Sequence, residues 1–132
     1  MTKAKTTWIE RQRFDGISDS GHKITVDGDK ATGNSPMELV LIGLCGCTAS
    51  DVATILRKKR ESYTLLEVRA QAERAADVPR VFTSIKLLYR VSDTVSRKAM
   101  EDSVRLSKEK YCSVSQMLAK AVPISYEIEY VK

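Results

Sequence analysis

The chain has 132 residues, 42% of them hydrophobic and 30% charged, which is ordinary for a single folded domain covering residues 1–132. Its formal net charge is +5, but acidic residues are interleaved with the basic ones and no nucleic-acid-binding motif is present, so we expect no nucleic acid partner. The N-terminus lacks the apolar segment of a signal peptide, and an odd number of cysteines, three, does not suit a secreted disulfide framework; we therefore expect a cytoplasmic protein.

The N-terminal part of the chain is predicted to form a β-hairpin. Residues 5–14 alternate loosely and contain Thr, Trp, Ile and Phe, which favours a strand. Residues 16–21 are rich in Gly and Ser and indicate a turn, and residues 22–26 indicate a second strand. A polar loop over residues 27–34 follows, in which Gly, Asp and Asn supply turn conformations and form no glycine-rich nucleotide motif.

A long helix is predicted over residues 35–60. Ser35 suits the N-cap, Pro36 the first helical position, and Glu38 falls three residues after the cap, which together form a capping box. No charged side chain occurs over residues 39–49, so we expect this helix to be buried on every side. Its apolar part is expected to be too short to span a bilayer, and we expect no membrane partner.

The second half of the chain is predicted to add two strands, two helices and a last strand. Residues 62–73 and 81–91 alternate and should pair as a hairpin, and residues 124–131 alternate in the same way. Between them, helical spacing starts near residue 92 and breaks near Cys112, and Ser113 with Gln116 is interpreted as a second capping box. The order β-β-α-β-β-α-α-β predicts an α+β fold, with an antiparallel sheet wrapped on the buried central helix. One small sheet cannot cover that helix, which favours a dimer.

The cysteines are the main chemical signal. Cys45 and Cys47 point to roughly opposite faces of the helix, so they cannot easily bond each other, but one of them could meet Cys112. Cys112 precedes a helix whose free N–H groups favour a thiolate, whereas Cys47 would need a nearby cation. Such a pair suits a cycle of thiolate attack, sulfenic acid and disulfide. The alternative is that these cysteines are inert core residues. The single histidine, His22, does not suggest a metal site, and we expect no metal.

Two sequence segments resemble the family of osmotically inducible protein C and organic hydroperoxide resistance proteins (OsmC/Ohr). They are Ser-Pro-Met-Glu-Leu at residues 35–39, leading to Gly46-Cys47, and Tyr-Cys-Ser-Val-Ser at residues 111–115. The resemblance implies an OsmC-like fold, an intertwined homodimer, and thiol-dependent reduction of organic hydroperoxides. Cys47 would be the peroxidatic cysteine and Cys112 the resolving one. A dithiol such as a lipoylated protein would be the reductant, and no cofactor is implied.

The sequence departs from the family pattern in the groups that assist the thiolate, and it looks closer to the OsmC-like branch. Met37 replaces a glutamate that follows the proline in the family, and the family's arginine aligns with Gln12. The supporting candidates are therefore the neighbouring glutamate and nearby arginines: Glu38, Arg11, Arg13 and Arg80.

These departures keep a second function open. The alternative is a non-catalytic OsmC-like dimer that senses redox state or binds a small apolar ligand. Met37 in place of the family's glutamate is the feature that motivates it. Asp51, one helical turn after Cys47, could hydrogen-bond locally, and a carboxylate there is expected to raise the pKa of the thiol, which does not assist a peroxidase.

Overall fold

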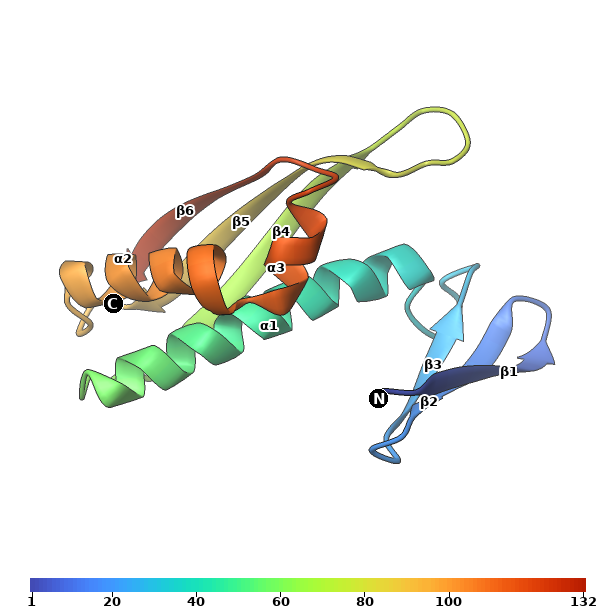
Figure 1. Ribbon diagram of the computed structural model, residues 1–132, viewed down its shortest axis with the longest axis horizontal. Coiled ribbons are helices and arrows are strands. Elements are labelled where there is room, and N and C mark those ends of the chain that lie inside the picture. Colours follow the sequence, from blue (N-terminus) through green and yellow to red (C-terminus); the bar gives the residue numbers. More distant parts are fainter. The chain divides into compact units, whose positions relative to one another are not determined.

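The computed structural model describes residues 1–132 as an α+β protein, as predicted. Figure 1 shows its strands and helices in chain order: β1 (Ala4–Glu10), β2 (Arg13–Ser18), β3 (Lys23–Asp27), α1 (Pro36–Lys58), β4 (Leu66–Arg74), β5 (Phe82–Ser92), α2 (Arg97–Leu106), the π-helix η1 (Ser107–Tyr111), α3 (Ser113–Leu118) and β6 (Ile124–Val131). The contacts divide the chain into two compact units, Met1–Leu41 and Ile42–Lys132.

The N-terminal unit contains three antiparallel strands in the order β1-β2-β3, not the two that were predicted. The prediction of one strand over residues 5–14 is wrong because Arg11 and Gln12 form a tight turn. Arg11 has a φ of 47°, which a strand does not allow, and its carbonyl accepts a hydrogen bond from Trp8 Nε1 at 2.9 Å. Since all of β1 is exposed, this small sheet has little core of its own.

The loop that leads into α1 is held by its own polar side chains. Asp27 accepts hydrogen bonds from the Asp29 amide at 2.8 Å and from the Thr32 amide at 2.9 Å. The predicted capping box is confirmed, since Ser35 Oγ accepts the Glu38 amide at 3.2 Å and a Glu38 carboxylate oxygen accepts the Ser35 amide at 2.9 Å. The start of α1 is therefore encoded locally.

Burial of α1 on every side is not observed in the single chain. Its fully buried residues recur at helical spacing on one face: Leu44, Thr48, Val52 and Leu56. On another face Ile42 is 52% exposed, and Gly43 and Gly46 are exposed as well. The expectation that α1 is too short to cross a membrane is wrong, because its length and composition are sufficient. The core helices of soluble proteins share these two properties.

The second unit is built on a three-stranded sheet in the order β4-β5-β6. The predicted β4–β5 hairpin is confirmed as an antiparallel pair, but β6 pairs with β5 in parallel, so the expectation of a wholly antiparallel sheet is wrong. A parallel neighbour requires a long crossover, which α2, η1 and α3 provide. Figure 1 shows α1 and α2 covering one side of this sheet, and the central strand buries Ile85, Leu87, Tyr89 and Val91 toward them.

The break predicted near Cys112 is a change of helix type. Helix α2 continues into η1, in which the Cys112 amide donates to the Ser107 carbonyl at 2.7 Å, five residues back. Such π-helical turns insert one residue into a helix and occur often at functional sites. Here the turn ends directly at Cys112, whose backbone is extended.

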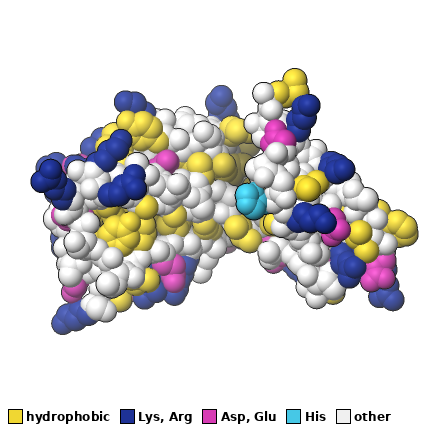
Figure 2. Space-filling model, turned by 90° about the horizontal axis from the view of Figure 1, so that it is seen from below, with side chains coloured by type: hydrophobic (Ala, Val, Ile, Leu, Met, Phe, Trp, Pro, Cys, Tyr) yellow, Lys and Arg dark blue, Asp and Glu magenta, His cyan; other side chains and the backbone are white.

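Charged and hydrophobic side chains both reach the surface. Figure 2 shows Lys and Arg spread over the visible face, with Asp and Glu among them and hydrophobic side chains between. Several large apolar side chains are exposed in the single chain, including Trp8 at 63% and Ile24 at 51%.

Candidate active site

The structure brings Cys47 and Cys112 together. Their sulfur atoms and a carboxylate oxygen of Asp51 all lie within 4.8 Å of one another. Cys47 and Asp51 are one helical turn apart on α1, and Cys112 arrives from the junction of η1 and α3. Cys45 is half-buried and lies outside this cluster, so of the two α1 cysteines it is Cys47 that meets Cys112.

The two clustered thiols differ in their access to water. Cys47 is partly exposed, whereas Cys112 is fully buried. Burial raises the pKa of Cys112 from 9.0 to about 11, the Ser115 amide that donates to its sulfur at 3.3 Å lowers it only in part, and Cys47 and Asp51 raise it further. The expected help from the N–H groups of the following helix is present, but desolvation is the larger effect, so the pKa of Cys112 is raised overall.

The cap of α3 also differs from the prediction. Cys112 itself is the N-cap, since its sulfur accepts the Ser115 amide, so Ser113 does not begin a capping box. Gln116, the expected partner of Ser113, instead donates to the carbonyls of Lys108 at 2.8 Å and Glu109 at 3.0 Å. The Ser115 amide thus holds the Cys112 sulfur, and Gln116 ties α3 to the backbone of η1 just before it.

A buried chain of hydroxyl groups ends at Asp51. Ser107 Oγ donates to Asp51 Oδ2 at 2.9 Å, Thr48 Oγ1 lies 2.8 Å from Ser107 Oγ, and the Tyr89 hydroxyl lies 2.7 Å from Thr48 Oγ1. An ionised carboxylate only accepts, so each hydroxyl must donate toward Asp51 and accept from the hydroxyl behind it. Tyr89 can begin this chain because burial raises its pKa to about 12 and keeps it protonated.

A cation that interacts with Cys112 is Lys108, which is not among the residues predicted from the sequence. Lys108 Nζ donates to the Ile124 carbonyl at 3.0 Å and lies 5.0 Å from the centre of the Tyr126 ring. Burial lowers the pKa of this ammonium group, and the thiol of Cys112 acts against that change. Residues 107–111, Ser-Lys-Glu-Lys-Tyr, have mixed charge, so the sequence does not distinguish Lys108 from other surface lysines. Its position beside Cys112 follows from the π-helical turn η1.

The supporting residues predicted from sequence have other contacts. The Glu38 carboxylate serves the cap of α1. Arg11 lies in the β1–β2 turn, and Arg13 pairs with Glu10 at 3.8 Å. Arg80 lies in the loop between β4 and β5, where its Nε donates to the Ala75 carbonyl at 3.4 Å. A role for these four residues beside Cys47 stays a prediction.

The three clustered groups are also the donor atoms that a metal ion would need. Two sulfurs and one carboxylate oxygen supply three ligands, and a fourth protein ligand is absent from the cluster. Full burial of Cys112 suits a thiol that reacts with its neighbour, so we treat the cluster as a thiol centre and not as a metal centre. The expectation of no metal stays a prediction.

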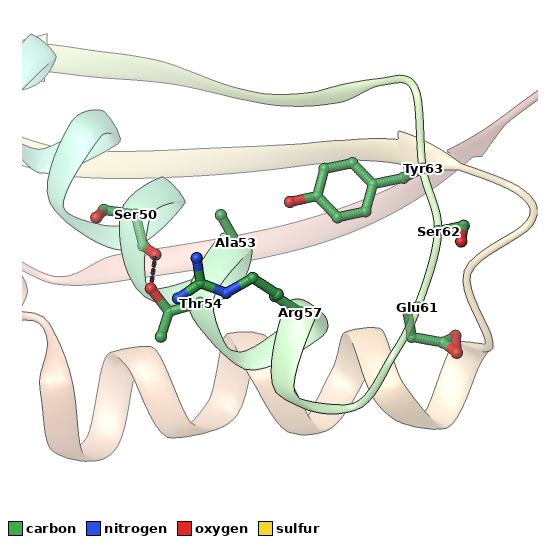
Figure 3. A pocket seen from close by; sticks show the side chains of 7 residues that line it. All are labelled: Ser50, Ala53, Thr54, Arg57, Glu61, Ser62 and Tyr63. Carbon is green, nitrogen blue, oxygen red and sulfur yellow. Dashed lines mark hydrogen bonds between the residues drawn. The ribbon is translucent and has the colours of Figure 1, made fainter.

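The hollow drawn in Figure 3 lies further along α1 and has different chemistry. Its volume is about 500 Å³, and its lining is mostly polar: Ser50, Ala53, Thr54, Arg57, Glu61, Ser62 and Tyr63. Figure 3 shows the Tyr63 hydroxyl directed toward α1 and the bond from Thr54 Oγ1 to the Ser50 carbonyl, which is 2.9 Å long. No sulfur lines this hollow, so we do not assign the thiol chemistry to it.

The raised pKa values predict that the reduced protein loses stability in alkali. Below pH 9.0 Cys112 is protonated in both the folded and the unfolded chain, whereas up to about pH 11 only the folded chain keeps the proton. Folded protein therefore binds more protons in this window, and its free energy of unfolding falls as the pH rises. Urea unfolding at several pH values measures this. Cys112→Ala is expected to flatten the curve, and an equally steep fall in that variant would contradict the assignment.

Two three-stranded sheets, a long capped helix, and a cysteine from that helix beside a cysteine from the parallel crossover are features of one class of protein. The model of the OsmC-like protein family matches residues 27–127, and the chain belongs to this family. It is 44% identical to protein YhfA from Escherichia coli strain K12, over 98% of both chains.

Solved structures agree with this fold. The OsmC-like protein from Mycoplasma pneumoniae has a TM-score of 0.86 at 17% identity, covering 100% of this chain and 98% of its own. The organic hydroperoxide resistance protein OhrB of Bacillus subtilis has a TM-score of 0.70 at 16% identity, covering 98% of both chains. At these identities the likeness concerns the fold. The predicted family and the OsmC-like α+β fold class are confirmed, and the intertwined dimer stays a prediction.

Proposed function

We propose that this protein reduces organic hydroperoxides with thiols, using Cys47 as the peroxidatic cysteine and Cys112 as the resolving cysteine. The observation that supports this most directly is the pairing of one partly exposed and one fully buried thiol within 4.8 Å. A peroxide from solution can reach Cys47 but not Cys112, and a buried partner next to it can close a disulfide. The fold that this chain shares with organic hydroperoxide resistance proteins supports the same chemistry.

In the proposed cycle the Cys47 thiolate attacks one peroxide oxygen, the O–O bond breaks, and the alkoxide takes a proton and leaves as an alcohol. Cys47 is thereby oxidised to the sulfenic acid. The sulfur of Cys112 then attacks the Cys47 sulfur, the S–O bond breaks, and water leaves. A dithiol reductant finally attacks the disulfide, returns both cysteines to thiols, and is itself oxidised to a disulfide.

The proposed partners are a second copy of the chain and a dithiol such as a lipoylated protein. Support for the dimer comes from apolar surface that one chain leaves uncovered, on α1 at Ile42 and on the β1-β2-β3 sheet at Trp8 and Ile24. A mass determination in solution tests the dimer. The guanidinium that would stabilise the Cys47 thiolate is proposed to come from Arg11, Arg13 or Arg80, with Glu38 as the supporting carboxylate. A cytoplasmic location stays a prediction.

The proposal is tested by turnover. The protein is mixed with an organic hydroperoxide and dihydrolipoamide, and peroxide loss is measured together with peptide mapping of the oxidised protein. We expect many turnovers per subunit and a Cys47–Cys112 disulfide when dithiol is omitted. Peroxide loss equal to that of dithiol alone would overturn the proposal.

Sensing without turnover is the second candidate, and one observation favours it. The Asp51 carboxylate lies within 4.8 Å of both sulfurs and raises the pKa of Cys112, which disfavours the resolving thiolate that repeated turnover requires. A sensor is expected to form the disulfide stoichiometrically and to consume about one peroxide per subunit. The turnover number separates the two functions.

A further inference from the structure

Asp51 lies in the thiol cluster, yet the attack on peroxide gives it no use. Its carboxylate oxygen lies within 4.8 Å of both sulfurs, but it carries no positive charge that could stabilise the Cys47 thiolate that the first step requires. At the same time, three buried hydroxyl groups are arranged to hold this carboxylate in place. The fold thus fixes the position of a carboxylate that the attack on peroxide does not use. We therefore ask whether Asp51 serves the second step, in which Cys112 forms the disulfide with Cys47.

The second step poses a proton problem. Cys112 must lose its proton to attack Cys47, but it is fully buried and has no direct contact with water that could take the proton. Burial also keeps this thiol protonated at neutral pH. A nearby acceptor is therefore needed during disulfide closure.

The groups around Cys112 offer one acceptor. From η1 comes the Lys108 ammonium, which has no lone pair, and from α3 comes the Ser115 amide, which donates to the sulfur. From β5 comes the Tyr89 hydroxyl, which donates to Thr48; β6 contributes the Tyr126 phenol, which lies against Tyr89 and Lys108. From α1 come Cys47, the group being attacked, and the carboxylate of Asp51.

The hydroxyl chain orients this acceptor. Ser107 donates to Oδ2 of Asp51, which leaves Oδ1 without a hydrogen bond from a protein group. Because Ser107 also supplies the carbonyl that accepts the Cys112 amide, one residue positions both the carboxylate and the thiol. Ser107 is thus a positioning residue for the pair.

We propose that Asp51 takes the proton of Cys112 as the disulfide closes and passes it to the departing hydroxide. This inference rests on the proposed function for its sulfenic acid substrate. In balance, the Cys112 S–H bond and the Cys47 S–O bond break, the S–S bond forms, and the hydroxide leaves as water with the proton that Asp51 received. Asp51 returns to the carboxylate, and no net proton is consumed.

Two possible effects of Asp51 predict opposite signs. If Asp51 acts only as a nearby negative charge, Asp51→Asn makes the Cys112 thiolate easier to form and closure becomes faster. If Asp51 is the proton acceptor, the same substitution removes the acceptor and closure becomes slower. The direction of the change therefore decides between a bystander and a participant.

The test uses closure from a mixed disulfide, which requires no peroxide. In a Cys45→Ser background, Cys47 is labelled as the 2-thiopyridyl disulfide, and attack by Cys112 releases thiopyridone, which is followed by absorbance. We expect Asp51→Asn to slow release at least ~10-fold near neutral pH, in line with the loss of a general base. The matched control, Asp77→Asn in the exposed β4–β5 loop, is expected to match the parent.

A pH profile adds a readout that a merely structural role does not change. The parent rate should depend only weakly on pH near neutrality, whereas the Asp51→Asn rate should keep rising about tenfold per pH unit, as expected for hydroxide acting in place of the carboxylate. Ser107→Ala is the second variant, and it decides the question if Asp51→Asn does not fold. Several-fold slower release supports the proposal, and an unchanged or faster rate in the folded variant overturns it.

A peroxide arm separates this inference from the proposed function. With organic hydroperoxide and dimedone, the folded Asp51→Asn protein should accumulate more trapped Cys47 sulfenic acid than the parent. If neither protein forms sulfenic acid, the peroxidase proposal fails, and thiopyridone release still decides whether Asp51 accepts the Cys112 proton.

Discussion

Replacing Cys47 with serine is expected to abolish hydroperoxide turnover, lowering the rate by roughly three orders of magnitude or more. A serine hydroxyl has no thiolate to attack the peroxide, and no other thiol can substitute, because Cys112 is fully buried and Cys45 lies outside the cluster. Peroxide loss in the presence of dihydrolipoamide measures the effect, after subtraction of the rate with dithiol alone.

The chain offers a matched control for this substitution. Cys45→Ser changes a half-buried cysteine on the same helix, two positions away, and its turnover is expected to stay within about twofold of the parent. Cys112→Ser should still form sulfenic acid at Cys47 but no disulfide within one chain. Equal loss of activity in the Cys45 and Cys47 variants would show that the helix, and not one thiol, had been damaged.

Thr48→Val is expected to destabilise the protein by about 3 kcal/mol although the side-chain volume hardly changes. The hydroxyl of Thr48 is fully buried and connects the Tyr89 hydroxyl to Ser107. Valine removes both hydrogen bonds and leaves the Tyr89 proton without an acceptor in the core, where an unsatisfied polar group costs about 1–3 kcal/mol. Urea unfolding of the reduced protein measures the change in the free energy of unfolding.

The same helix again provides the control. Thr54 is exposed, and its hydroxyl donates only to the Ser50 carbonyl of its own helix, so Thr54→Val is expected to change stability by less than about 0.5 kcal/mol. If both valine variants were equally stable, the buried hydroxyl chain would not be a structural link between α1, β5 and η1.

Local signals in the sequence were sufficient for most of the fold. The capping box at Ser35 and Glu38 uses only neighbouring residues, and alternation along β4, β5 and β6 shows which side of each strand faces the core. The direction of β6 relative to β5 could not be predicted in this way, because alternation is the same in parallel and antiparallel strands. The turn at Arg11 was missed because no glycine or proline marks it.

The two cysteines of the candidate site could be predicted from the sequence, but the polar side chains around them could not. Family resemblance selected Cys47 and Cys112, and the structure places them together. Thr48, Ser107 and Tyr89 were missed because they meet only in the fold: 59 positions separate Thr48 from Ser107, and no spacing rule connects them. Lys108 depends on the π-helical turn, which sequence periodicity does not reveal.

Under the proposed chemistry, the parallel pairing of β6 with β5 leaves Cys47 without its resolving partner until folding is complete. Cys112 lies in the crossover between these strands, so it reaches Cys47 only after α2, η1 and α3 have packed on the sheet, and such non-local contacts form late. A chain that meets peroxide before that moment has an oxidisable Cys47 without its partner, and further oxidation leads to sulfinic acid, which ordinary thiols do not reverse. Under the proposed chemistry, completed folding is what makes the oxidation of Cys47 reversible.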